Sequence, residues 1–381
     1  MHPIPRDRLD YLDGLRGWAA LSVVIFHCTW ELFGSFLPLV RTSYASLLND
    51  GNLAVYIFFV LSGLVLSHGF LVTSDVARLQ RLAIGRYLRL AIPIAAASLI
   101  CLLLLEYGLM FNTDAVKVVG RPDWLGMPYQ MAPSVLSWAR FFSFDVFFHY
   151  DFYSSYDSVL WTMPIELTGS YIVFGLLALS GARRRARLIY CAASLTILWL
   201  VNPIMCTFVY GVLIAQLMRS RTYRRLSSGM TGNLLGLACF AAACVGSVFN
   251  RGDLGNTTPA YLAIGAILGP VLSPALRRLF ESAVSRWLGR VSFPLYLLHS
   301  FVIYSLISAA ILWFHHHGYS RLSTVICIAP GTVIASLLAA RVFYPVERLA
   351  ITISHRFAHV ALFDHPSLVT GSPAGECDVS P

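Results

Sequence analysis

The chain contains ten apolar segments, and this number limits it to folds that form inside a membrane. About 20 mainly apolar residues are enough for one helix to cross the hydrocarbon core of a bilayer. Only 12% of the 381 residues are charged, about half the share of a soluble domain, and the mean hydropathy is +0.68. We therefore predict an all-α integral membrane protein with about ten transmembrane helices, since a helix satisfies its own backbone in lipid. The segments are 12–37, 50–72, 88–109, 159–180, 188–203, 205–218, 232–249, 258–273, 291–313 and 323–343.

The basic residues predict how these segments are oriented. If the N-terminus is cytoplasmic, 21 Lys and Arg side chains fall on the cytoplasmic side and 6 on the opposite side. Such an excess of cytoplasmic positive charge is typical of membrane proteins. We therefore expect cytoplasmic N- and C-termini in a multi-pass protein of the plasma (inner) membrane, whose partner is the lipid bilayer. The same distribution accounts for the net charge of +9 without a nucleic-acid partner.

The sequence indicates one membrane domain with a short tail. We expect residues 1–350 to form the transmembrane domain and the polar stretch 351–381 to be a cytoplasmic C-terminal tail. Met1–Asp13 is followed by a full-length span without a small-residue cleavage site, so no cleavable signal is expected. The longest connection, 110–158, faces outward in this topology and is rich in aromatic residues. Its rings either anchor it at the membrane interface or stack on carbohydrate, and both interpretations stay open.

The first apolar segment carries Arg16 near its start and His27 near its middle. Their spacing corresponds to about 20° past three helical turns, so they share one face at about 16 Å from each other along the axis. Ionisable groups within a span are costly and normally face a protein interior or a wet cavity. A snorkelling arginine and a lone hydrogen-bonded histidine are the alternative, but the shared face favours a catalytic pair. Glu31, four residues after His27, is a supporting candidate that would fix the tautomer of the imidazole.

Two later segments carry further candidates. Glu166 lies near the outward end of the fourth segment, where we expect it to orient an imidazole or to accept a proton. A carboxylate that bonds a neighbouring helix is the alternative role. His299, in the ninth segment, either bonds a neighbouring helix or lines a reaction cavity, and it is a second supporting candidate.

The connection between the second and third segments is rich in arginine. Arg86 and Arg89 are three residues apart at the start of a predicted helix, so both can reach one anion. Topology alone is the alternative explanation for these charges. No metal site is predicted, because His315–His317 lack acidic or cysteine partners and the eight cysteines lie mostly in apolar segments.

Four motifs in a fixed order resemble the membrane acyltransferase-3 family. They are LDGLRGWAALSVVIFH, FFVLSG, WTMPIE and SFPLYLLH. The resemblance implies an integral membrane O-acyltransferase in which Glu166 and Trp161 belong to the Trp–Glu stretch. It also implies that Arg86 and Arg89, with Arg81 less securely, hold the phosphates of acyl-CoA. The closing stretch YPVER departs from the family, because Leu349 follows it where a proline is expected.

The function implied by this resemblance is transfer of an acetyl group from cytoplasmic acetyl-CoA to a hydroxyl of an exported sugar. The acceptor would be a polysaccharide, a lipid-linked glycan or a glycosylated metabolite. Histidine can act near neutral pH as a base or as a transient acyl carrier, and the sequence leaves both routes open. The alternative is a proton-coupled small-molecule transporter that uses Arg16, His27 and Glu166, although the inverted repeats of transporters are not seen. A non-catalytic scaffold, the third possibility, leaves the cost of these buried polar groups unexplained.

Overall fold

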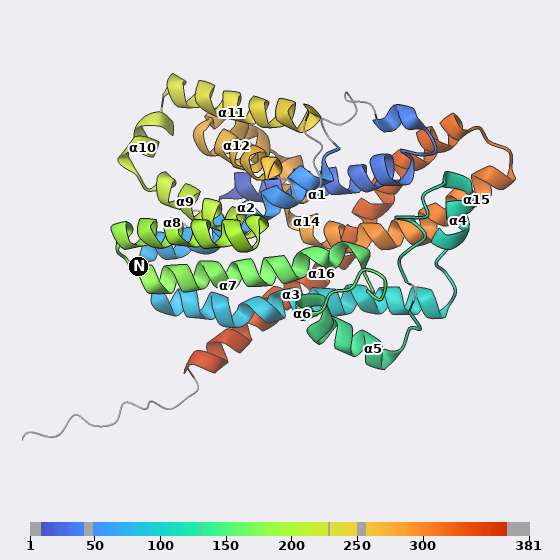
Figure 1. Cartoon of the computed structure of the whole chain (residues 1–381), viewed down its shortest axis with the longest axis horizontal. Coiled ribbons are helices and arrows are strands. Elements are labelled where there is room, and N and C mark those ends of the chain that lie inside the picture. Colours follow the sequence, from blue (N-terminus) through green and yellow to red (C-terminus); the bar gives the residue numbers. More distant parts are fainter. Residues whose placement is uncertain (1–8, 42–48, 130, 228, 250–256, 364–381) are drawn as a thin grey trace, which may run out of the picture.

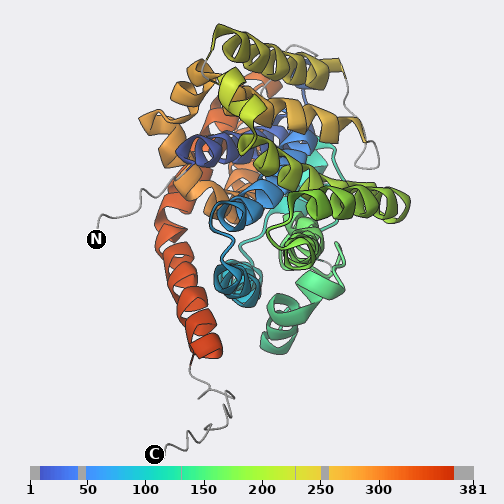
Figure 2. The same ribbon diagram turned by 90° about the vertical axis from the view of Figure 1, so that its left-hand side faces the viewer.

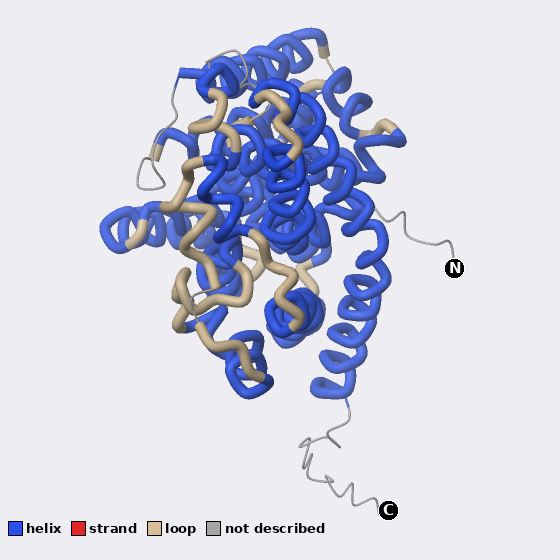
Figure 3. The backbone as a smooth tube through the Cα atoms, turned by 90° about the vertical axis from the view of Figure 1, so that its right-hand side faces the viewer, coloured by secondary structure: helices blue, strands red, loops and turns tan. Residues whose placement is uncertain are grey.

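The structure, a computed structural model, describes residues 9–41, 49–129, 131–227, 229–249 and 257–363. These residues form helices joined by turns and loops, with no strand among them (Figure 3). Six helical segments are long and apolar enough to cross a membrane, or up to eight if each bent pair is one span. The all-helical, multi-spanning fold is thus confirmed. Each of the ten predicted segments contains a helix, but a count of ten spans stays a prediction.

The longer helices run side by side along one direction of the molecule (Figure 1). They are α1 (Asp10–Phe26), α2 (Gly51–Thr73), α3 (Val76–Glu106), α7 (Met163–Ser180), α8 (Arg184–Val201), α9 (Cys206–Met218), α11 (Met230–Phe249), α12 (Thr258–Leu272), α14 (Ala283–Val302) and α16 (Arg321–Phe363). The shorter α-helices are α4 (Asn112–Val119), α5 (Val135–Arg140), α6 (Val146–Phe148), α10 (Arg221–Ser227), α13 (Pro274–Phe280) and α15 (Ser308–His316). Turns of π-helix occupy η1 (His27–Leu32), η4 (Phe141–Asp145) and η7 (Ile303–Ile307), and 3₁₀ turns occupy η2 (Pro38–Arg41), η5 (Ser158–Thr162) and η6 (Pro203–Met205).

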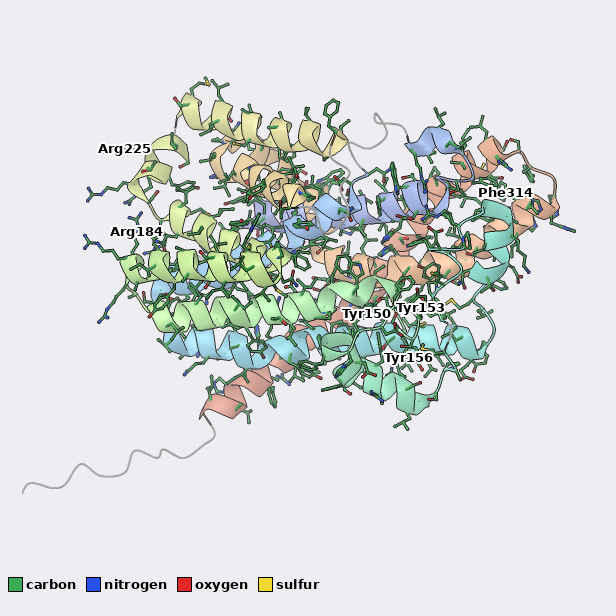
Figure 4. The ribbon with its side chains drawn as sticks, viewed as in Figure 1. Tyr150, Tyr153, Tyr156, Arg184, Arg225 and Phe314 are labelled. Atoms are coloured by element: carbon green, nitrogen blue, oxygen red, sulfur yellow. The ribbon has the colours of Figure 1, made fainter. Side chains whose placement is uncertain are left out.

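The two ends of the helix bundle differ in chemistry. The first part of the connection 110–158, with α4, lies at the right-hand end in Figure 1 together with α15, and α5 and α6 follow along the lower edge toward the middle. Loops gather at this end when it faces the viewer (Figure 3). Arg184 and Arg225 project from the opposite end (Figure 4). These two arginines and the first part of the long connection therefore lie at opposite ends of the bundle, and the orientation in the membrane stays a prediction.

Two helices extend more than ten residues beyond the predicted apolar segments. α3 begins at Val76, where the side chain of Asp75 accepts a hydrogen bond from the backbone N–H of Arg78. Arg86 and Arg89 therefore lie inside α3 rather than at the start of a helix. α16 packs against α3 and α14 along one side of the bundle (Figure 2) and continues to Phe363. The proposed domain boundary at residue 350 falls within this helix, and most of the predicted tail, 364–381, lies outside the described residues.

The helix carrying Arg16 packs most extensively against α14, and glycine makes this approach possible. A Cβ on Gly17 would lie 2.4 Å from the backbone nitrogen of Gly289. Conversely, a Cβ on Gly289 would lie 2.4 Å from the carbonyl oxygen of Asp13. Real Cβ contacts are never so short, so any larger residue forces the two backbones apart. This close contact places the polar residues of α1 beside those of α14.

The contact predicts that Gly289→Ala destabilises the protein, because the added methyl group meets backbone rather than a flexible side chain. We expect a cost of about 1–3 kcal/mol, as for other overpacked interiors. Gly175→Ala in α7 is the matched control, since no atom lies within 4 Å of its added Cβ and alanine favours a helix. Thermal unfolding of the full chain in detergent measures both, and equal midpoints for the two variants would contradict the packing argument.

Candidate active site

A cavity of about 710 Å³ opens between α1, α2, α3, α7, α14 and α16. Its size is in the range of small-molecule binding sites. Six arginines line it, namely Arg16, Arg81, Arg86, Arg89, Arg286 and Arg290. The acidic residues in its lining are Asp10, Asp13, Glu166 and Glu347. Cations outnumber acids, so the cavity, which we call the arginine cavity, is suited to an anionic ligand.

Arg86 and Glu166 form an ion pair in the inner part of this cavity. The guanidinium of Arg86 donates to Glu166 Oε1, and both side chains are largely buried, at 15% and 13% exposure. Arg86 Nε also donates to Ser170 Oγ at 2.9 Å, and its Nη2 donates to Ser62 Oγ at 3.2 Å. Ser62 Oγ in turn donates to Glu166 at 2.5 Å. α2, α3 and α7 are thus joined by one charged hydrogen-bond network.

The other arginines of the cavity differ in how their charge is balanced. Arg89 Nη2 lies 3.4 Å from Glu347 on α16, and Arg16 lies 3.8 Å from Asp13 on its own helix. Arg81 is more exposed and lies 3.5 Å from Asp75. Within the described part of the chain, no carboxylate lies within ion-pair distance of the remaining two, Arg286 and Arg290 on α14. Their positive charge is available to a ligand.

His27 and His299 form a second polar centre. His27 Nδ1 and His299 Nε2 are 2.7 Å apart, and the two rings are nearly parallel, with 6° between their planes. His299 Nδ1 lies 2.8 Å from the carbonyl oxygen of Tyr296 and 3.1 Å from that of Leu295. Because carbonyl oxygens only accept, His299 carries its proton on Nδ1 and presents a bare Nε2. His27 therefore donates from Nδ1, which leaves the lone pair on its own Nε2.

The two rings differ in exposure. His27 is only partly buried, whereas His299 is fully buried. In the part of the chain that the structure describes, His27 Nε2 makes no hydrogen bond. His27 lies in η1, where the α-helical ladder widens to a π-helical turn, an irregularity found often at functional sites. A neutral imidazole with a fixed tautomer and one free nitrogen is equipped to accept a proton.

Tyr296 connects the two polar centres. Its side chain lines the arginine cavity, while its carbonyl oxygen holds the proton of His299. The hydroxyl of Tyr296 donates to the carbonyl oxygen of Val159 and bonds Thr162 Oγ1 at 2.8 Å. His27 itself is not among the residues that line the cavity. Glu166, which we expected near the imidazole, bonds Arg86 instead.

Two supporting candidates lie apart from the histidine pair. Glu31 does not bond His27, because the π-helical turn changes the angle between residues four apart. Its Oε2 accepts from Arg121 Nη2 at 2.6 Å, and His299 takes the partner position that we predicted for it. Trp161 lines a separate hollow of about 400 Å³ beside Tyr56 and Trp199. Among the described residues, no group of three or more His, Cys, Asp and Glu is placed to hold a metal.

Sequence reasoning missed four cavity residues. Arg286 and Arg290 were explained by membrane topology alone, although their spacing of four residues on a helix was a usable signal. Glu347 was noticed only as part of the YPVER stretch, and Ser62 only within FFVLSG. Neither motif indicates by itself which arginine its polar side chain meets.

Comparison with known proteins gives two matches. The model of a family described as an acyltransferase domain matches residues 9–341, a region that includes His27, His299 and the Arg86–Glu166 pair. The O-acetyltransferase PaAT-1 of Phomopsis amygdali is 27% identical to this chain in a match that covers 76% of the chain and 71% of the relative. No solved structure matches the chain.

The ion pair predicts a large effect for Glu166→Gln, which leaves the charge of Arg86 without its counter-ion. We expect a loss of about 2 kcal/mol or more in unfolding free energy, between the values for exposed and fully buried pairs. The control is Asp114→Asn, which removes the exposed pair with Lys117 and should cost less than about 1 kcal/mol. The double variant R86Q/E166Q should recover part of the loss in thermal unfolding. Strictly additive costs would show that the two side chains are not coupled.

Proposed function

The chain belongs to the membrane acyltransferase-3 family and is an acyltransferase, and from this premise we propose that it moves an acetyl group from acetyl-CoA to a hydroxyl of an exported sugar. The observation that carries the proposal is the fixed His27–His299 pair, which adjoins the arginine cavity through Tyr296. The name of the relative supports an acetyl donor and an oxygen acceptor.

In our proposal the arginine cavity holds the donor. Acetyl-CoA carries several phosphate charges on a long, flexible arm that ends in the thioester. Arg286, Arg290 and Arg16 would contact these phosphates, because their guanidinium groups are less engaged than that of Arg86. Arg86 and Arg89 would shape the cavity through their pairs with Glu166 and Glu347. The thioester would then reach the inner end of the cavity near Tyr296.

We assign proton transfer to His27 Nε2. The acceptor hydroxyl attacks the thioester carbonyl while its proton passes to Nε2. The carbon–sulfur bond then breaks, and the leaving thiolate takes the proton back from His27 to become the thiol of CoA. During the step His27 is positively charged, and its Nδ1–H donates to His299, which spreads this charge. His299 thus does the orienting work that an acid does in other catalytic sites.

The same proposal implies one orientation of the protein in the membrane. The arginine-rich end would be cytoplasmic, with both termini there, and the connection 110–158 would face outward at the plasma membrane. The ten apolar segments would then be ten spans, with residues 1–350 as the membrane domain. The acceptor would be a polysaccharide, a lipid-linked glycan or a glycosylated metabolite that meets His27 from the outward side.

The assignment predicts that His27→Ala lowers acetyl transfer by about 10²–10⁴-fold, the usual contribution of a general base. His317→Ala is the control, because His317 lies at the end of α15 and bonds only its own helix. Transfer of label from radioactive acetyl-CoA is measured in membranes that contain the full chain. Undiminished transfer by a well-folded His27→Ala variant would remove the proposed base.

The donor site predicts that the double variant R286Q/R290Q raises the KM for acetyl-CoA by about tenfold or more with little change in kcat. The physical reason is the loss of two charge-assisted contacts to phosphate. Arg278→Gln on α13 is the matched control, since Arg278 is exposed and does not line the cavity. If the control raised KM as much as the double variant, the effect would come from general surface charge and not from the cavity.

A further inference from the structure

The connection after α4 lies against the reactive histidine. Trp124, in this connection, stacks near His27 with 5.4 Å between ring centroids and 27° between the planes. Trp124 also contacts Tyr304, with 5.5 Å between centroids. The indole is only partly buried, so part of its surface is free for a ligand. No candidate residue from the family motifs lies in this connection.

An ion-pair network sets the position of Trp124. Arg121 Nη2 lies 2.6 Å from Glu31 Oε2, and the two side chains are 12% and 17% exposed. Arg121 also pairs with both carboxylate oxygens of Asp123, at 3.0 and 3.1 Å. We call these three residues, Glu31, Arg121 and Asp123, the acidic clasp. Because Asp123 directly precedes Trp124, the clasp holds the indole by its neighbouring residue.

A second contact holds the other side of Trp124. The side chain of Asn112 is 2% exposed, and its Nδ2 donates to the carbonyl oxygen of Leu125 at 2.8 Å. Leu125 is fully buried. Trp124 is therefore fixed on both sides, and the clasp ties it to η1, the same turn that carries His27. A tryptophan side chain that merely lay at the surface would not need contacts on both sides.

We propose that Trp124 is the acceptor-binding wall of the site at His27, positioned by the Glu31–Arg121 pair, and that it takes a sugar ring. This inference rests on the proposed function. One face of a sugar ring presents C–H groups that cover an indole, while its hydroxyls stay at the edge. A ring seated on Trp124 would bring a hydroxyl to the free Nε2 of His27. The clasp keeps the base and the acceptor wall in register because Glu31 lies in the same turn as His27 and pairs with Arg121, three residues before Trp124.

The test uses membranes with the full chain and radiolabelled acetyl-CoA, and it measures the ratio of label in the glycan and glycoside fraction to label in free acetate. Trp124→Ala should lower this ratio by about tenfold, because the acceptor is lost while water still enters. Trp124→Phe, which keeps an aromatic face, should recover most of it. Trp313→Ala is the matched control, an outward tryptophan that contacts His317 and Tyr319.

The clasp is tested by a double-mutant cycle. Glu31→Gln and Arg121→Gln should each lower the ratio by several fold, and the double variant should lower it no further than one of them. Lys117→Gln, which breaks an exposed pair on the neighbouring helix α4, should leave the ratio unchanged. A ratio in Trp124→Ala and Arg121→Gln equal to that of an active wild-type chain would overturn this inference alone. A wild-type chain that forms no labelled acceptor would overturn the proposed function and this inference with it.

Discussion

The close contact between α1 and α14 is the constraint on which the site depends. Glycines at 17 and 289 allow the two backbones to touch, and the contact brings His27 within hydrogen-bond distance of His299. A polar side chain in a membrane interior is tolerated when its hydrogen bonds are satisfied. The contact satisfies one ring nitrogen of each histidine, and the carbonyl oxygens of Leu295 and Tyr296 on α14 itself hold the other nitrogen of His299. Among the described residues this leaves His27 Nε2 for chemistry. A wider helix separation would break the bond between the two rings and leave one nitrogen of each imidazole without its partner.

Some arginines of the arginine cavity hold its walls together through ion pairs and hydrogen bonds. Others keep their charge available to a ligand. Arg86 directs its donors to Glu166, Ser62 and Ser170, so little of its capacity is left for a ligand. Removing such a pair is costly because the surviving charge stays in a poorly solvated place. Arg286 and Arg290 are exposed at the cavity wall and make no such network with the residues that the structure describes. Arg86, which the family resemblance singles out, therefore has less charge available to a ligand than Arg286 and Arg290.

The sequence was sufficient for the helical membrane fold and for the family, but not for the pairing of the polar side chains. Composition and apolar length predicted the helices, and the shared face of Arg16 and His27 indicated a functional first segment. The partner of His27 could not be found this way, since a helical wheel assumes a regular helix and η1 is a π-helical turn. Glu31 was thus assigned to the imidazole although it bonds Arg121. Contacts between distant segments, such as His27 with His299 and Arg89 with Glu347, leave no periodic signal in one sequence.

The hydrogen bonds of the histidine pair also bear on the choice between acyl transfer and proton-coupled transport. A transport pathway needs groups that receive a proton on one side and release it on the other. Here the chain from His27 through His299 ends on the backbone carbonyl oxygens of Leu295 and Tyr296. A carbonyl oxygen accepts a hydrogen bond but does not pass a proton onward. Among the described residues this chain of hydrogen bonds offers a proton taken up at Nε2 no onward route, which suits a base that returns its proton to the leaving thiolate better than a proton wire.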